Sequence, residues 1–173
     1  ALILFGNKVE ARSLAQSCDI PVVPGSPVAF SSVAEAQEFA KSVGYPVMLK
    51  AAAGGGGRGM RAVARSEDLK EAIERCRSEA MAAFGEDDVF MEKLIERPRH
   101  IEVQILADAV GEAIHLYERD CSVQINHQKV VEIAPAPALD ESLRQKIHSD
   151  AVRLVKAASY VNAGTVELLV SPE

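Results

Sequence analysis

The stretch "KAAAGGGGRGMR", Lys50 to Arg61, places five glycines within six residues. An ordered glycine loses more conformational entropy than any other residue, so this run indicates a backbone that must approach something closely. The preceding "YPVMLKAA" is a short apolar run of strand type, and the following "MRAVAR" alternates as a strand does. The stretch therefore predicts a hairpin with a glycine tip.

The glycines match neither the dinucleotide-binding fingerprint nor the P-loop, but they suit a hairpin that binds phosphates. Gly54, Gly56 and Gly59 satisfy G-x-G-x-x-G, but a dinucleotide-binding fingerprint needs a helix directly after the glycines. A P-loop needs Lys where Met60 stands. A glycine hairpin can instead donate backbone N–H groups to phosphates, as in protein kinases, although H-R-D and D-F-G are absent. Three cations accompany the glycines: Lys50, Arg58 and Arg61. The residues alone still leave open a flexible tip without a ligand.

The composition argues against several classes of protein. The net charge of -6 disfavours non-specific binding to nucleic acid. Three cysteines without CxxC spacing indicate a reducing compartment and no structural zinc. No apolar run approaches the roughly 20 residues of a membrane span, and the start is unlike a signal or transit peptide. We therefore expect neither nucleic acid nor membrane among the partners.

Helices and strands alternate along the chain, which predicts an α+β or mixed α/β fold. Helices are expected at 7–17, 31–43, 66–84 and 140–158. Strands are expected at 1–5, 45–52, 60–65, 88–95, 100–108, 112–120, 129–135 and 164–173. The strand at 100–108 should place Ile101, Val103 and Ile105 on one face and His100, Glu102 and Gln104 on the other. The chain has no initiator Met and has strands at both ends, so we expect a segment of a longer protein.

Five motifs, in order along essentially all 173 residues, resemble one family. They are "KAAAGGGGRGMR", "RHIEVQILAD", "ERDCSVQ", "HQKVVEIAPAP" and "AGTVELLV". Together they resemble the biotin carboxylase module of biotin-dependent carboxylases, which has an ATP-grasp fold. Within that family, "HLYERDCSVQ" and "NAGTVELLV" are most similar to pyruvate carboxylases. The resemblance implies an enzyme that uses MgATP and bicarbonate to form carboxyphosphate and then carboxylates N1 of biotin on a carrier protein.

The resemblance also implies how the chain divides. Residues 1–21 would link to an amino-terminal domain that is absent here. Residues 22–94 would form the ATP-grasp lid with the glycine hairpin. Residues 95–173 would form part of the larger carboxy-terminal subdomain, with ATP bound between the two.

The resemblance assigns roles to particular residues. The nucleotide-binding positions would be Lys8, Lys50, Gly55, Gly56, Gly57, Gly59, Met60, Glu92, Lys93, Leu94, Ile95, His100 and Gln124. His127 and Lys129 would be catalytic, with Lys129 stabilising the charge that develops on carboxyphosphate. Glu167 would bind Mg²⁺, which Mn²⁺ can replace. The 92–95 stretch would contact adenine through the backbone and apolar side chains.

The implied partners are ATP, bicarbonate, a biotinylated carrier domain and the remaining domains of a homo-oligomeric parent protein. The implied location is the cytoplasm or the mitochondrial matrix. The acceptor of the carboxyl group stays open, because pyruvate, acetyl-CoA and propionyl-CoA carboxylases share this module.

The sequence departs from the family at one site. Ile125 and Asn126 stand where the family commonly has two arginines, so two guanidinium groups are missing there. The family's second magnesium glutamate, a catalytic arginine and the base for bicarbonate would all follow Glu173. We therefore expect negligible carboxylase activity and at best weak MgATP binding from this chain alone. The alternatives are another ATP-grasp carboxylase or ligase, and a non-catalytic nucleotide-binding module.

Overall fold

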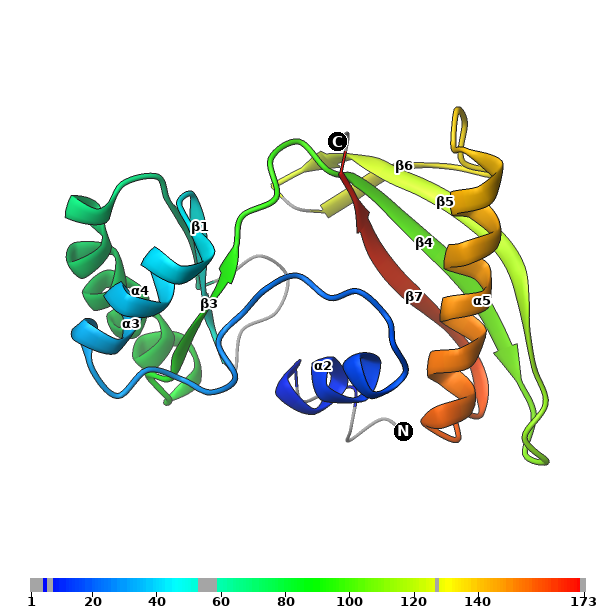
Figure 1. Ribbon diagram of the computed structural model, residues 1–173, viewed down its shortest axis with the longest axis horizontal. Helices are drawn as coiled ribbons and strands as arrows, with labels where there is room; N and C mark the ends of the chain where they lie inside the picture. Colours follow the sequence, from blue (N-terminus) through cyan, green and yellow to red (C-terminus); the bar gives the residue numbers. More distant parts are fainter. Residues whose placement is uncertain (1–4, 6–7, 53–58, 127, 172–173) are drawn as a thin grey trace. The chain divides into compact units, whose positions relative to one another are not determined.

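The computed structural model describes residues 5, 8–52, 59–126 and 128–171, without the side chains of Lys8 and Val9. The chain divides into two compact units (Figure 1). Residues Val23–Ile95 form one, called here the hairpin unit. Ala1–Val22 and Glu96–Glu173 form the other, called here the sheet unit. Both contain helices and antiparallel strands, so the α+β class is confirmed.

The hairpin unit has a three-stranded antiparallel sheet in the order β2-β1-β3. Its strands are β1 (Val47–Ala51), β2 (Met60–Val63) and β3 (Val89–Lys93). β1 and β2 flank the glycines and pair antiparallel, from Val47 opposite Val63 to Lys50 opposite Met60. The strand–glycine–strand hairpin predicted from the sequence is therefore confirmed at both of its arms.

Two amphipathic helices bury the apolar side of this sheet. They are α3 (Val33–Val43) and α4 (Leu69–Phe84), and a short 3₁₀ turn, η1 (Ser66–Asp68), precedes α4. The helix predicted at 31–43 begins at Val33, because the Ser32 hydroxyl accepts a hydrogen bond from Glu35 N at 3.2 Å and so satisfies one orphan donor of the first turn. The core includes Ala36 and Ala40 of α3, together with Val47, Leu49, Leu69, Ile73 and Met91.

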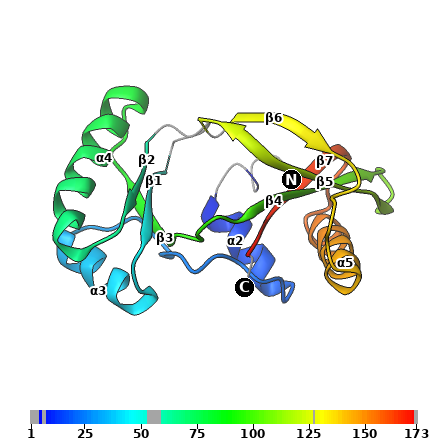
Figure 2. The same ribbon diagram turned by 90° about the horizontal axis from the view of Figure 1, so that it is seen from above.

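The sheet unit has a four-stranded antiparallel sheet in the order β6-β5-β4-β7. Its elements are α2 (Lys8–Ser17), β4 (Arg99–Ala107), β5 (Ala113–Ile125), β6 (Gln128–Ile133), α5 (Glu141–Ala157) and β7 (Asn162–Val170). Figure 2 shows α5 on one side of the sheet. None of the helices within the described residues has the length and apolarity that a bilayer crossing needs.

The alternation predicted for β4 sets the two faces of this sheet. Ile101, Val103 and Ile105 are fully or almost fully buried and belong to one cluster with Ile147, Ala151 and Val155 of α5. Because side chains alternate along a strand, the residues between them project from the opposite face. That opposite face carries His100, Glu102 and Gln104, and is called here the polar face.

Two predictions for this unit need correction. Ala1–Phe5 was expected to be a strand, but Phe5, its one described residue, is helical. β5 was expected to end at Asp120, whereas it continues to Ile125. It continues because pairing with β6 extends to Gln124–Lys129 and Ile125–Gln128, and these pairings lie beyond the apolar alternation that the sequence displays.

Candidate functional site

Charged side chains from neighbouring strands meet on the polar face of the sheet unit. Glu102 on β4 lies directly opposite Arg119 on β5 and directly opposite Glu167 on β7. Two carboxylates side by side on adjacent strands repel each other unless a cation lies between them. This arrangement therefore requires a cation near both glutamates.

Lys129 on β6 supplies that cation. Its Nζ lies 2.6 Å from Glu167 Oε1 and also donates to Glu102 Oε2. Burial by itself lowers the pKa of Lys129, but the hydrogen bonds to both carboxylates outweigh this effect and raise the pKa above its ordinary value. The Lys129 ammonium is therefore charged throughout the physiological range, as a group that stabilises negative charge must be.

Glu102 is a buried carboxylate with a cation at each oxygen. Its side chain is 2% exposed, with Arg119 at Oε1 and Lys129 at Oε2. Burial raises the pKa of Glu102, but the hydrogen bonds from Lys129 and Arg119 outweigh it, so the net pKa is lowered. A buried carboxylate is stable in its charged form only when paired in this way.

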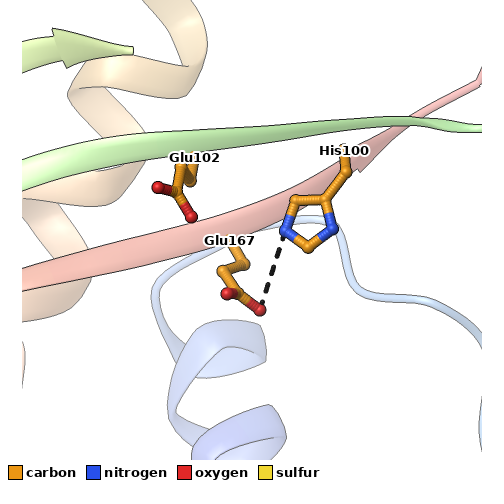
Figure 3. Close-up of side chains that lie close together, drawn as sticks. All are labelled: His100, Glu102 and Glu167. Carbon is orange, nitrogen blue, oxygen red and sulfur yellow. Dashed lines mark ion pairs between the residues drawn. The ribbon is translucent and has the colours of Figure 1, made fainter. Parts of the chain in front are cut away.

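His100 and Gln124, both predicted nucleotide contacts, are hydrogen-bonded partners. Gln124 Nε2 lies 2.9 Å from Cys121 O and 3.0 Å from His100 Nδ1. The contact to a carbonyl identifies this Gln124 atom as the amide donor, so His100 Nδ1 accepts and Nε2 carries the proton. Nε2 is buried without a hydrogen-bond partner in the described part of the chain. It lies 3.7 Å from Glu167 Oε2 (Figure 3).

Three side chains with metal-ligating atoms lie close together on the polar face, but only Glu167 can offer such an atom to a hard divalent cation. Ligand atoms of His100, Glu102 and Glu167 lie within 4.8 Å of one another. Both Glu102 oxygens already bind cations, and the proton assigned to His100 Nε2 makes that atom a donor. Glu167, whose side chain is 55% exposed, is therefore the member that can offer a carboxylate oxygen to Mg²⁺.

In the hairpin unit, Lys50 pairs with Glu92. The Lys50 ammonium on β1 donates to the Glu92 carboxylate on the adjacent strand β3. Their side chains are 25% and 15% exposed. Two residues to which the resemblance assigns nucleotide binding are thus brought into contact, and the half-buried ammonium is held at a defined point on the sheet.

Residues of the 92–95 stretch form hydrogen bonds inside the hairpin unit. Lys93 Nζ donates to Gly44 O and Tyr45 O, each at 3.0 Å. The backbone N–H of Lys93 donates to Pro24 O at 2.7 Å and that of Leu94 to Pro46 O at 3.1 Å. Leu94 and Ile95 are half-buried. Two backbone N–H groups of the predicted adenine-contacting stretch, those of Lys93 and Leu94, are therefore already hydrogen-bonded within this unit.

Gly59 has a local reason to be glycine. Its φ is 67°, and a Cβ there would lie 2.8 Å from Ala51 Cβ. Met60 follows as the first residue of β2 and is half-buried. The other predicted site positions, Gly55, Gly56, Gly57, His127 and the Lys8 side chain, lie outside the described residues.

The position of the expected arginines is a tight turn. Ile125 ends β5 opposite Gln128, and Asn126 follows with a φ of 51°. Asparagine tolerates this left-handed conformation better than most residues, so the turn explains Asn126. Ile125 is 64% exposed.

Residues 7–173 match the family described as carbamoyl-phosphate synthase L chain, ATP binding domain. The chain belongs to that family. It is 59% identical over 166 residues to pyruvate carboxylase 1 of Caenorhabditis elegans, which covers 96% of this chain and 14% of that protein. The chain thus spans about one-seventh of the curated relatives that it matches.

Solved structures agree with this membership of the carbamoyl-phosphate synthase L chain, ATP binding domain family. A biotin carboxylase complex from Campylobacter jejuni superposes with a TM-score of 0.92 at 49% identity, covering 96% of this chain and 37% of that one. Rhizobium etli pyruvate carboxylase gives 0.85 at 52% identity, covering 95% and 14%. The resemblance to pyruvate carboxylases and the ATP-grasp fold are confirmed.

Sequence reasoning missed two members of this candidate site. Glu102 was placed on the polar face of its strand without a role, and Arg119 was not singled out. Both would have been hard to find, because their importance comes from cross-strand contacts between β4, β5, β6 and β7. The available signal was an acidic residue between the buried Ile101 and Val103 in the middle of a strand.

Proposed function

We propose that this chain is the ATP-binding part of a biotin carboxylase, within a parent pyruvate carboxylase. The parent would use MgATP and bicarbonate to form carboxyphosphate and would carboxylate biotin on a carrier domain. The division at residues 21/22 and 94/95 and the residue roles given by the resemblance are part of this proposal.

The observation that carries the proposal is the Lys129 ammonium held between Glu102 and Glu167. Two carboxylates fix this ammonium in position while 28% of its side chain stays exposed. A preorganised cation of this kind stabilises negative charge that develops on a transferring phosphoryl group. Lys129 would therefore bind the phosphate and bicarbonate oxygens as carboxyphosphate forms.

Other residues to which the resemblance assigns a role would serve the same nucleotide. The His100 Nε2–H would donate to a nucleotide oxygen, with its tautomer set by Gln124. Lys50 would contribute a phosphate contact from the hairpin unit. Glu167 would hold Mg²⁺, which neutralises phosphate charge when bound.

The test is bicarbonate-dependent ATP cleavage by the full-length parent protein, with and without free biotin. We expect cleavage that needs bicarbonate and rises with biotin. Lys129→Gln should lower kcat by about 100-fold, the size of effect seen when one preorganised donor is removed. Lys146→Gln is the matched control, because Lys146 lies on α5, where it pairs with Asp150. Cleavage that ignores biotin would favour an ATP-grasp ligase of another kind.

A further inference from the structure

Arg119 connects the charged residues of the polar face. Its Nε lies 3.0 Å from Glu102 Oε1 and 3.1 Å from Glu132 Oε2, and its Nη1 donates to Gln104 Oε1 at 2.9 Å. Nη2 also donates to Glu102 Oε1. One half-buried guanidinium thus binds side chains of both adjacent strands, β4 and β6.

The two oxygens of Glu102 are divided between two cations. Arg119 binds Oε1 through two nitrogens of its planar fork, and Lys129 binds Oε2. Because the fork fixes Oε1, it also fixes the direction in which Oε2 points. At 2% exposure, Glu102 has little access to water that could replace a lost donor.

Glu102 is the stronger of the two anchors for Lys129. The Glu167 side chain is 55% exposed, so solvent and salt screen its attraction for the ammonium. The Glu102 contact is buried and is screened much less. The position of Lys129 therefore depends chiefly on Glu102.

We infer that Arg119 is a positioning residue for Lys129, acting through Glu102. Without the guanidinium, both Glu102 oxygens turn to the one remaining cation, and the Lys129 ammonium is drawn away from Glu167. This inference rests on the proposed function only where it concerns catalysis. The change in side-chain geometry follows from the contacts alone.

The test compares Arg119→Met, which removes the charge but keeps the stem, with Arg119→Lys, which keeps a charge but loses the fork. Both are made in the full-length parent protein. Arg99→Met is the matched control, because Arg99 also binds a carboxylate across β4 and β5, that of Asp120, and then reaches Pro137 and Ala138 carbonyls.

We expect both Arg119 variants to lower kcat of bicarbonate-dependent ATP cleavage by about 10- to 100-fold. The KM for ATP should change by less than about threefold, because Arg119 positions Lys129 without binding substrate. Arg99→Met should keep kcat within about threefold. If Arg119→Met does not fold, the Arg119→Lys result decides.

A structural readout accompanies the kinetics. In crystals of an Arg119 variant, the distance from Lys129 Nζ to Glu167 Oε1 should exceed about 3.5 Å, the limit of a hydrogen bond. An unchanged distance, an unchanged kcat, a raised KM with normal kcat, or an equal loss in Arg99→Met would each overturn the inference. If the wild-type parent shows no bicarbonate-dependent cleavage, the proposed function fails, and the distance alone decides the role of Arg119.

Discussion

Ala51 and Gly59 are in direct contact across the base of the glycine hairpin. Ala51 N donates to Gly59 O at 2.9 Å, and a Cβ on Gly59 would lie 2.8 Å from Ala51 Cβ. Gly59 also has a φ of 67°. Position 59 therefore excludes other side chains both by conformation and by the closeness of the neighbouring strand.

Gly59→Ala should destabilise the chain by about 2–4 kcal/mol, combining the cost of a left-handed alanine with steric overlap. Chemical denaturation measures this loss. Gly85→Ala is the control, because Gly85 has a φ of 78° with nothing within 4 Å of the added Cβ. It should lose only about 1–2 kcal/mol. Equal losses would show that the contact with Ala51 has no effect.

Glu118 should make the stability of the sheet unit sensitive to acid. This fully buried carboxylate binds His148 Nε2 at 2.6 Å, Arg144 Nε at 3.0 Å and Ala136 N at 3.1 Å. Burial raises the pKa of Glu118, but these hydrogen bonds lower it by a larger amount, so the net pKa is below the ordinary value of 4.5. A depressed carboxyl pKa stabilises the fold above about pH 4.5, and this contribution is lost as pH falls through the folded pKa.

The measurement is the free energy of unfolding between about pH 3 and pH 7. Glu118→Gln should cost about 3 kcal/mol at neutral pH, because it leaves Arg144 without its buried partner, and should flatten the acid limb. Glu112→Gln, at an exposed side chain, should follow the wild type. An acid limb of unchanged slope in Glu118→Gln would contradict the assignment.

Lys50→Ala should weaken binding of MgATP to this chain. Removing a charged donor to phosphate costs roughly 1.5–3 kcal/mol, so we expect affinity to fall at least about tenfold. Calorimetric titration of the chain with MgATP measures it. Lys41→Ala, at an exposed lysine in the last turn of α3, is the control. Equal affinities for the wild type and Lys50→Ala would remove Lys50 from the nucleotide site.

Gln124→Leu should allow the His100 ring to adopt either neutral tautomer. In the wild type, the Gln124 amide donates to Nδ1, so nitrogen NMR of the His100 ring should show a proton on Nε2 at neutral pH. The variant should show a mixture of both tautomers. Gln128→Leu, at an exposed residue of β6, should leave the ring signals unchanged. A single Nε2–H tautomer in Gln124→Leu would show that another contact fixes the ring.

Patterns along the sequence predicted the main elements. Alternation of Ile101, Val103 and Ile105 predicted β4 and its buried face, and the pattern at 31–43 predicted α3 to within two residues of its start. The glycine run gave the hairpin of β1 and β2. Each of these features depends on residues close together in the chain, where periodicity and capping act directly.

Contacts between distant residues could not be predicted in this way. Glu102 is buried because Arg119 and Lys129, 17 and 27 residues away, cover it. Nothing in the sequence pattern indicates that His148 binds Glu118, which lies 30 residues away on another element. Such pairs depend on strand register and on helix docking, which composition and periodicity leave undetermined.

The charged residues of the polar face also restrict how the strands align. A slip of β5 by one residue against β4 would turn Arg119 toward α5 and its apolar core, since successive strand residues face opposite sides. It would also leave the buried Glu102 carboxylate without its guanidinium partner. A register shifted by one residue therefore costs free energy in two ways: it buries the Arg119 charge in the apolar core, and it leaves the Glu102 carboxylate unpaired. The charged residues of the polar face that hold Lys129 in position thus also favour the correct strand pairing while the chain folds.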